Sequence, residues 1–91
     1  MKKEFYNIAN LVTKNAKILD VGCGNGELMK YITENISKDI MGIELSKSNV
    51  QKCVEKGLTV IEGDAEKDLR QFPDNSFDFV ILSQTLQAFF C

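Results

Sequence analysis

The sequence has no histidine, no tryptophan, one proline and only three cysteines in 91 residues. Without histidine, a zinc site would have too few of its preferred ligands, and the commonest general base is missing. Cys23, Cys53 and Cys91 are widely spaced and form no CxxC pair. The sequence therefore favours neither a metal centre nor a disulfide framework. It also identifies no catalytic side chain.

The chain also lacks an excess of positive charge and any long apolar run. Its formal net charge is −2, which provides no basic surface for a nucleic acid. No apolar stretch approaches the ~20 residues that a membrane span needs. Glu4, Asn7 and Asn10 stand where a signal peptide would need an apolar stretch. We therefore expect a cytoplasmic protein with neither nucleic acid nor membrane as a partner.

The residues that are present predict a small α/β domain. Apolar residues make up 44% and charged residues 26%, as in ordinary globular proteins. Their periodicity predicts helices over 4–13, 27–36 and 47–56, a short helical segment over 64–71, and strands over 16–21, 39–45, 58–63 and 77–83. A turn is expected over 72–76 and the start of another helix over 84–90. This alternation predicts a Rossmann-like open parallel sheet with flanking helices on both faces. Ser46 and Gly57 are the expected N-cap and C-cap of the third helix.

Half of the six glycines fall in one turn, "DVGCGNG" at residues 20–26. Gly22, Gly24 and Gly26 directly follow the first predicted strand, at the sheet edge where α/β proteins bind ligands. Glycine permits positive φ angles and lets a ligand approach the main chain. The helix that follows directs free N–H groups toward the same space. These features favour a ligand site over a simple tight turn.

Acidic residues indicate what kind of ligand the site would take. Glu27 stands where a dinucleotide fingerprint has its third glycine, and Asp20 adds a second negative charge, which disfavours a nucleotide-binding oxidoreductase. A positively charged ligand without phosphate, such as S-adenosylmethionine, suits this loop better. Glu44 ends the second strand, in the usual position of a ribose ligand, and Asp64 ends the third, where it could accept from the adenine amine. Taken singly, Glu44 and Asp64 are more typical of solvated charges or helix caps. Their recurrence at successive strand ends indicates one site.

Several motifs resemble those of class I S-adenosylmethionine-dependent methyltransferases. In order, they are "ILDVGCGNGEL", "GIEL", "EGDAE" and "FPDNSFDFVILSQTLQA". The last, together with "NVQKCVEKGLTVIEGDAEKDL", is similar to the methionine-biosynthesis protein MetW family from about Lys14 onward. The resemblance implies a seven-stranded sheet, of which this chain would supply four strands.

The resemblance also implies S-adenosylmethionine as the cofactor. Its implied ligands are loop glycines and strand-end residues, namely Asp20, Gly22, Gly24, Gly26, Glu44, Asp64 and Ala65. The first four would surround the methionyl part, Glu44 would hold the ribose, and Asp64 with the Ala65 backbone would hold adenine. Ser83 and Gln84 would lie at the mouth where an acceptor enters. Cys23 is interpreted as a small loop filler, and Lys2 and Lys56 as solvated surface charges.

The family implies a role in methionine biosynthesis beside a homoserine O-acyltransferase. Two mechanisms stay open, methyl transfer to an unidentified acceptor and a cofactor-binding partner that regulates the acyltransferase. An alternative is an ordinary small-molecule methyltransferase of unknown acceptor. "SQTL" replaces the Asn/Asp-Pro-Pro-aromatic motif of many nitrogen methyltransferases, which disfavours a nucleic-acid N-methyltransferase.

The fourth predicted strand, "FDFVILS", is apolar on both sides and is therefore expected to be central and paired on both edges. Residues 84–91 can supply roughly two helical turns and no further strand partner. We therefore expect residues 1–91 to be the N-terminal portion of a single methyltransferase-like domain whose C-terminal strands are absent. A small complete fold that dimerises through this edge is the alternative.

Overall fold

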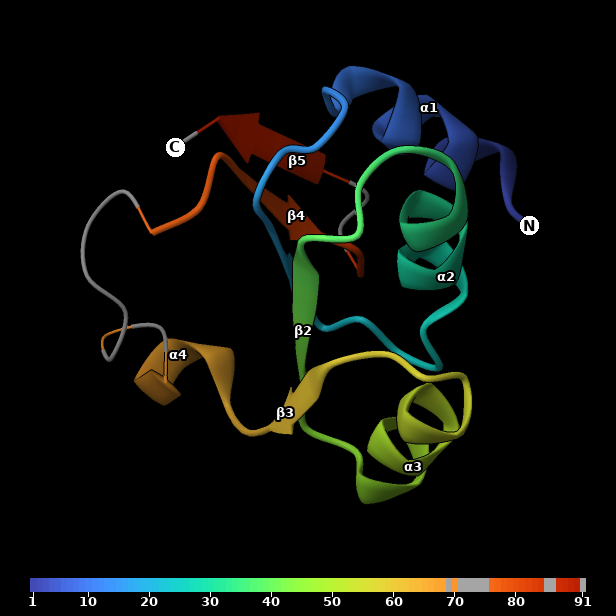
Figure 1. Cartoon of the computed structure of the whole chain (residues 1–91). Coiled ribbons are helices and arrows are strands. Elements are labelled where there is room, and N and C mark those ends of the chain that lie inside the picture. Colours follow the sequence, from blue (N-terminus) through green and yellow to red (C-terminus); the bar gives the residue numbers. More distant parts are fainter. Residues whose placement is uncertain (69, 71–75, 85–86, 91) are drawn as a thin grey trace.

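The computed structural model describes residues 1–68, 70, 76–84 and 87–90. Its elements are α1 (Lys3–Leu11), β1 (Ile18–Val21), α2 (Glu27–Asn35), β2 (Ile40–Glu44), α3 (Lys47–Glu55), β3 (Val60–Glu62), α4 (Ala65–Asp68), β4 (Phe79–Leu82) and β5 (Gln87–Phe90) (Figure 1). The predicted α/β class is confirmed, and the first eight elements lie within a few residues of their expected bounds. In the part of the chain that the structure describes, no helix is both long and apolar enough to cross a membrane.

The sheet has the strand order β3-β2-β1-β4-β5, and its first four strands are parallel. In the register, β1 lies between its two neighbours, with Val21 opposite Ile43 of β2 and Leu82 of β4. The chain progresses outward from β1 to β3 and then returns to place β4 on the other side of β1. This reversal is a topological switch point, which opens a crevice at the carboxyl ends of the parallel strands.

Apolar side chains cover both faces of the sheet, in two clusters of unequal size. Figure 1 shows α1, α2 and α3 on one side of the sheet and the four-residue α4 on the other. The larger cluster lies under the three long helices and includes Ile18 of β1, Met29 and Ile32 of α2, and Ile81 of β4. The smaller cluster consists of Leu19, Ile43 and Phe77. Strands that are apolar on both sides are typical of parallel sheets.

The expected helix over 84–90 is wrong, because Gln87–Phe90 forms β5, antiparallel to β4, with Ile81 opposite Ala88. A short apolar run has no periodicity that separates strand from helix. Pairing also satisfies the free backbone edge of β4, and aromatic residues favour strands. β4 is therefore paired on both edges, with β1 and β5, as predicted for a strand that is apolar on both sides. The expectation that residues 84–91 supply no strand partner for β4 was wrong. The expectation of absent C-terminal strands stays a prediction.

Some predictions lie outside the described residues. These are the tail of the helical segment at 69 and 71, positions 72–75 of the expected turn, and positions 85, 86 and 91. Within the described part, Ser46 is confirmed as the N-cap of α3, whereas the C-cap is Lys56 and the expected Gly57 is the residue after it. The Ser46 hydroxyl accepts from the Asn49 N–H at 3.3 Å. Gly57 ends the helix with a φ of 79°, its N–H bonding to the Val54 carbonyl.

Candidate functional site

The glycine loop between β1 and α2 adopts the left-handed backbone that its sequence predicts. Gly22, Gly24 and Gly26 have φ angles of 69°, 59° and 85°. A Cβ atom at Gly24 would meet no other atom within 4 Å, so its main chain is open to a ligand. At Gly26, a Cβ would lie 2.6 Å from Leu58 Cδ1 and 2.9 Å from Cys53 Sγ. Gly24 therefore leaves room in front of the loop, whereas Gly26 permits close packing behind it.

Glu44 ends β2 with a side chain that is only 4% exposed. Its Oε1 accepts from the Gly24 N–H at 2.8 Å, and its Oε2 accepts from the Ser46 N–H at 2.9 Å. The carboxylate thus joins the glycine loop to the start of α3. Each carboxylate oxygen has a further lone pair and can also accept from a ligand hydroxyl. The sequence predicted Glu44 at the site but not this structural link.

A cavity of about 290 Å³ lies at the carboxyl ends of the four parallel strands. Its lining consists of Val21, Gly22, Ile43, Glu44, Leu45, Gly63, Asp64, Ala65, Leu82 and Gln84. Four of the seven predicted cofactor ligands are among them, namely Gly22, Glu44, Asp64 and Ala65. Leu45 is 71% exposed and gives the cavity an apolar wall beside the carboxylates. A mostly apolar lining with a few convergent polar groups is typical of small-molecule sites.

Asp64 has two roles in the structure. Its Oδ1 accepts from the Glu66 N–H at 3.0 Å, which caps the short helix α4. Its own N–H donates to Oδ2 of Asp68 at 2.8 Å. Asp64 is therefore a helix cap, one of the two roles expected of it singly, and it also lines the 290 Å³ cavity.

A second cavity, of about 390 Å³, lies along residues 22–25 of the glycine loop. It is lined by Lys2, Phe5, Gly22, Cys23, Gly24, Asn25, Glu27, Ser83 and Gln84. Gly22 and Gln84 line both cavities, so they form the boundary between them. Ser83 and Gln84 thus line the second cavity, and the expectation that an acceptor enters beside them stays a prediction.

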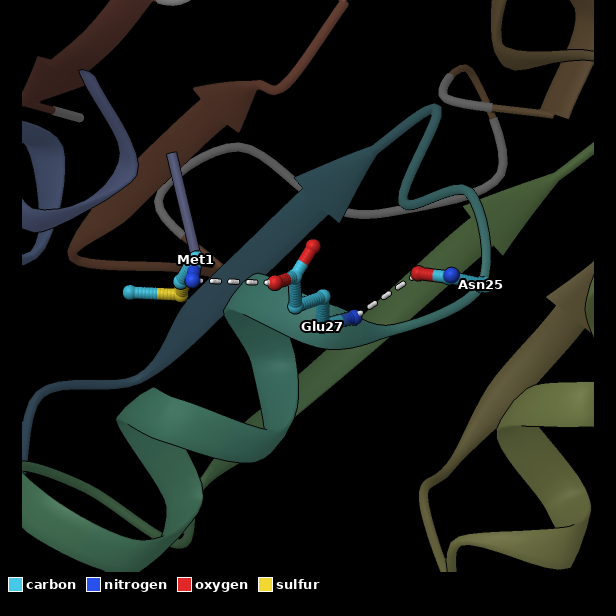
Figure 2. Close-up of polar contacts among 3 residues, drawn as sticks. All are labelled: Met1, Asn25 and Glu27. Carbon is cyan, nitrogen blue, oxygen red and sulfur yellow. Dashed lines mark hydrogen bonds and ion pairs between the residues drawn. The ribbon is translucent and has the colours of Figure 1, made fainter. Parts of the chain in front are cut away.

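Charges of both signs surround the second cavity. Glu27, at the start of α2, has its Oε1 3.5 Å from the amino group of Met1, and its N–H donates to Asn25 Oδ1 at 3.2 Å (Figure 2). Lys2 provides a positive charge in the same lining. Lys2 is exposed, as its interpretation as a solvated surface charge requires, and no sequence pattern marks its place beside this cavity.

Asp20 lies beneath the loop rather than in either cavity, and its side chain is fully buried. The Ser83 hydroxyl donates to its Oδ1, and its Oδ2 has no hydrogen-bond partner among the described atoms. Burial raises the pKa of Asp20 to about 7, the charge of Glu44 acts in the same direction, and the Ser83 hydrogen bond opposes both. Gly26 likewise lines neither cavity.

Two side chains of the α3 end contact the loop from behind. Cys53 Sγ donates to the Gly24 carbonyl at 3.3 Å, and Lys56 Nζ donates to the Asn25 carbonyl at 2.7 Å. Neither Cys53 nor Lys56 is predicted as a site residue from the sequence. Their partners are main-chain carbonyls, which every residue has, so no pattern of residue types marks these contacts.

Cys23 is a buried loop residue with no sign of nucleophilic activation. Burial raises the pKa of its thiol far above the usual range, and the charge of Asp20 adds to this effect. The thiol therefore stays protonated, as the interpretation of a loop filler requires. Among the described residues, no group of three or more histidine, cysteine, aspartate or glutamate side chains could hold a metal ion.

Comparisons with known proteins place this geometry in a family. The chain is 33% identical over 90 residues to the bifunctional methionine biosynthesis protein MetXA/MetW of Rhodopirellula baltica, covering 90% of this chain and 14% of that protein. Among solved structures, a TehB-like S-adenosylmethionine-dependent methyltransferase of Corynebacterium glutamicum matches with a TM-score of 0.70 and 26% identity, over 85% of this chain and 41% of that one.

A further fold match is a methyltransferase of Thiobacillus denitrificans in complex with S-adenosyl-L-homocysteine, with a TM-score of 0.67 and 20% identity. It covers 86% of this chain and 34% of that one. The chain therefore spans less than half the length of these proteins. The family model of the methionine biosynthesis protein MetW matches residues 2–90. The chain belongs to the MetW family of methionine biosynthesis proteins, and its fold is that of the S-adenosylmethionine-dependent methyltransferases.

Proposed function

We propose that the protein binds S-adenosylmethionine, or its product S-adenosylhomocysteine, as a methyltransferase-like component of methionine biosynthesis. The observation that carries this proposal is the 290 Å³ cavity in which Gly22, Glu44 and Asp64 meet at successive strand ends. The S-adenosylhomocysteine in the structurally similar Thiobacillus denitrificans methyltransferase supports the choice of ligand.

In this proposal the nucleoside occupies the 290 Å³ cavity. Glu44 accepts from the ribose hydroxyls, and Asp64 with the Ala65 backbone binds the adenine edge. Leu45 supplies an exposed apolar side chain for the base, since purine faces bind apolar and aromatic surfaces.

The amino acid end of the ligand extends into the 390 Å³ cavity, past Gly22 and Gly24. That end carries an ammonium and a carboxylate, and the cavity lining offers a charge of each sign in Glu27 and Lys2. Asp20 and Gly26 act from behind the loop, Asp20 through its hydrogen bond with Ser83. This arrangement retains all of the predicted site residues but gives these two an indirect role.

Methyl transfer needs little from protein acids and bases. When bound, S-adenosylmethionine would supply the methyl group of its sulfonium to the lone pair of an acceptor that attacks in line, and the sulfur would keep the electron pair of the broken S–C bond as a neutral thioether. The protein's part is to orient the donor and exclude water, which accounts for much of the rate in such reactions. A chain without histidine can therefore host this chemistry.

The partner that we propose is a homoserine O-acyltransferase. The bifunctional relative from Rhodopirellula baltica supports this partner, because its single polypeptide combines a MetW part with a MetXA part. We take the MetXA part to be the acyltransferase. A second candidate function is an ordinary small-molecule methyltransferase with an unidentified acceptor, which the similarity to the Corynebacterium glutamicum enzyme favours. Co-purification of the protein with its host's homoserine acyltransferase would favour the first candidate, and methylation of small molecules without that partner would favour the second.

The test of ligand binding is isothermal titration with S-adenosylhomocysteine. Glu44→Ala removes the proposed ribose ligand and should weaken binding by ~1.5–3 kcal/mol, or about ten- to a hundredfold. Glu62→Ala is the matched control, because Glu62 lies opposite Glu44 in the register, is exposed and lines neither cavity. Full affinity in Glu44→Ala would remove Glu44 from the site, and no binding by the unsubstituted protein would refute the proposal.

A further inference from the structure

The C-terminal end of α3 holds the glycine loop through two side chains that line neither cavity. Cys53 Sγ and Lys56 Nζ donate to two successive loop carbonyls, those of Gly24 and Asn25, at 3.3 and 2.7 Å. Cys53 and Lys56 are one helical turn apart, so both side chains can reach the same stretch of backbone. We call this pair the α3 clamp.

The cap of α3 explains why its end reaches the loop. The Gly57 N–H bonds to the Val54 carbonyl at 2.9 Å, and the Leu58 N–H bonds to the Cys53 carbonyl at 3.0 Å. This is the hydrogen-bond pattern of a Schellman motif, in which the chain turns back across the last helical turn. Leu58 thereby packs beside Cys53 against Gly26. Lys56, at the cap itself, is favourably placed at the negative end of the helix dipole.

The clamp fixes the loop together with Glu44. Gly24 is held at both of its main-chain polar atoms, with its N–H bonded to Glu44 Oε1 and its carbonyl to Cys53 Sγ. Asn25 is held at its carbonyl by Lys56. Gly24 and Asn25 line the 390 Å³ cavity but not the 290 Å³ cavity. A change in the clamp should therefore alter one cavity and leave the other intact.

We infer that Lys56 and Cys53 are positioning residues that hold Gly24 and Asn25 in the shape which accepts the amino acid end of the ligand. This inference rests on the proposed function. Neither residue touches the ligand in this account, and both act through loop carbonyls. Their effect is therefore specific to ligands that have the amino acid end.

The test compares two ligands that share a nucleoside. S-adenosylhomocysteine has the amino acid chain, whereas 5′-methylthioadenosine has only a methyl group in its place. Lys56→Met keeps the aliphatic stem but removes the donor. It should weaken S-adenosylhomocysteine binding about three- to tenfold, the effect of one modest hydrogen bond, and leave 5′-methylthioadenosine binding unchanged. Lys52→Met, the same substitution on the same helix, should leave both affinities unchanged.

Two further measurements separate positioning from a general loss of structure. Amide hydrogen exchange at Gly24 and Gly26 should be faster in Lys56→Met than in Lys52→Met, because the loop loses a tether. Lys56→Arg, which keeps a charged donor, should restore both the exchange rates and the affinity. Cys53→Ser keeps a donor and should bind S-adenosylhomocysteine more tightly than Cys53→Ala.

The outcomes distinguish the inference from the function on which it rests. If the unsubstituted protein binds neither ligand, the proposed function fails and the inference fails with it. If it binds both, equal weakening of the two ligands by Lys56→Met refutes the inference alone. A Lys56→Met protein whose ligand affinities and amide exchange rates equal those of Lys52→Met also refutes the inference.

Discussion

Single residues in this site have more than one structural role. Glu44 bonds two main-chain N–H groups and also borders the 290 Å³ cavity, and Asp64 caps a helix while lining the same cavity. Sequence spacing predicted where these carboxylates lie, because the ends of parallel strands meet at one edge of the sheet. It could not predict that Asp20 lies beneath the loop, since a residue's depth depends on what packs above it.

The burial of Asp20 predicts an unusual pH dependence of stability. Its folded pKa is raised from 3.8 to about 7, so the folded state binds a proton that the unfolded state has already lost in this range. The associated stability is full below about pH 4 and is lost as the pH rises toward 7. The amide side chain that Asp20→Asn introduces cannot ionise, so this variant does not lose stability in this way. Its free energy of unfolding should therefore exceed that of the unsubstituted protein by an amount that grows as the pH rises, to at most about 4 kcal/mol. Urea unfolding from pH 4 to 8 measures this, and parallel curves for the two proteins would contradict it.

The glycines of the loop differ in what a side chain would cost. Gly24→Ala should lose about 1 kcal/mol of stability through its positive φ alone, because nothing lies within 4 Å of the added methyl. Gly26→Ala should lose several times more, since its methyl also meets Leu58 and Cys53. Chemical denaturation of both variants provides the comparison. Equal losses would mean that the packing behind Gly26 relaxes without cost.

At the scale of elements, periodicity and caps predicted most of the chain. Amphipathic spacing identified α1, α2 and α3, and strand bounds were correct to about two residues because apolar runs lay between clear turn residues. The failure at Gln87–Phe90 has a physical cause, since four residues are too few to express a period and the partner strand decides their conformation. Val54 of α3 is 57% exposed although its neighbour Cys53 is fully buried, because the apolar stripe of this helix is narrow.

The N-cap of α3 offers a test of an element that borders the site. Ser46→Ala removes the acceptor for the Asn49 N–H and should cost about 1 kcal/mol of stability. The Ser46 N–H still donates to Glu44, so ligand affinity should change little. Denaturation and titration of one variant measure both effects. A large loss of affinity with little loss of stability would mean that the cap, and not Glu44, orders this edge of the site.

At the scale of the whole molecule, the site exists only when the sheet is assembled. The 290 Å³ cavity draws its lining from β1, β2, β4 and the segment after β3, which are distant in sequence and adjacent only in the fold. The alternation of elements predicted this edge, and the three glycines predicted which turn would be open. The α3 clamp was not predictable, because it requires the three-dimensional position of a helix end relative to main-chain carbonyls.

This dependence on the assembled sheet predicts strong coupling between ligand and fold. A ligand that binds only the folded state adds about 2.7 kcal/mol to the free energy of unfolding at a concentration of about 100 times Kd. S-adenosylhomocysteine should therefore raise the Tm of the unsubstituted protein and of Glu62→Ala to the same extent. Glu44→Ala should show a much smaller rise at the same ligand concentration, because fewer of its folded molecules are occupied. Binding by titration with no change in Tm would mean that a local segment holds the ligand without the sheet, and would contradict a site built from four strand ends.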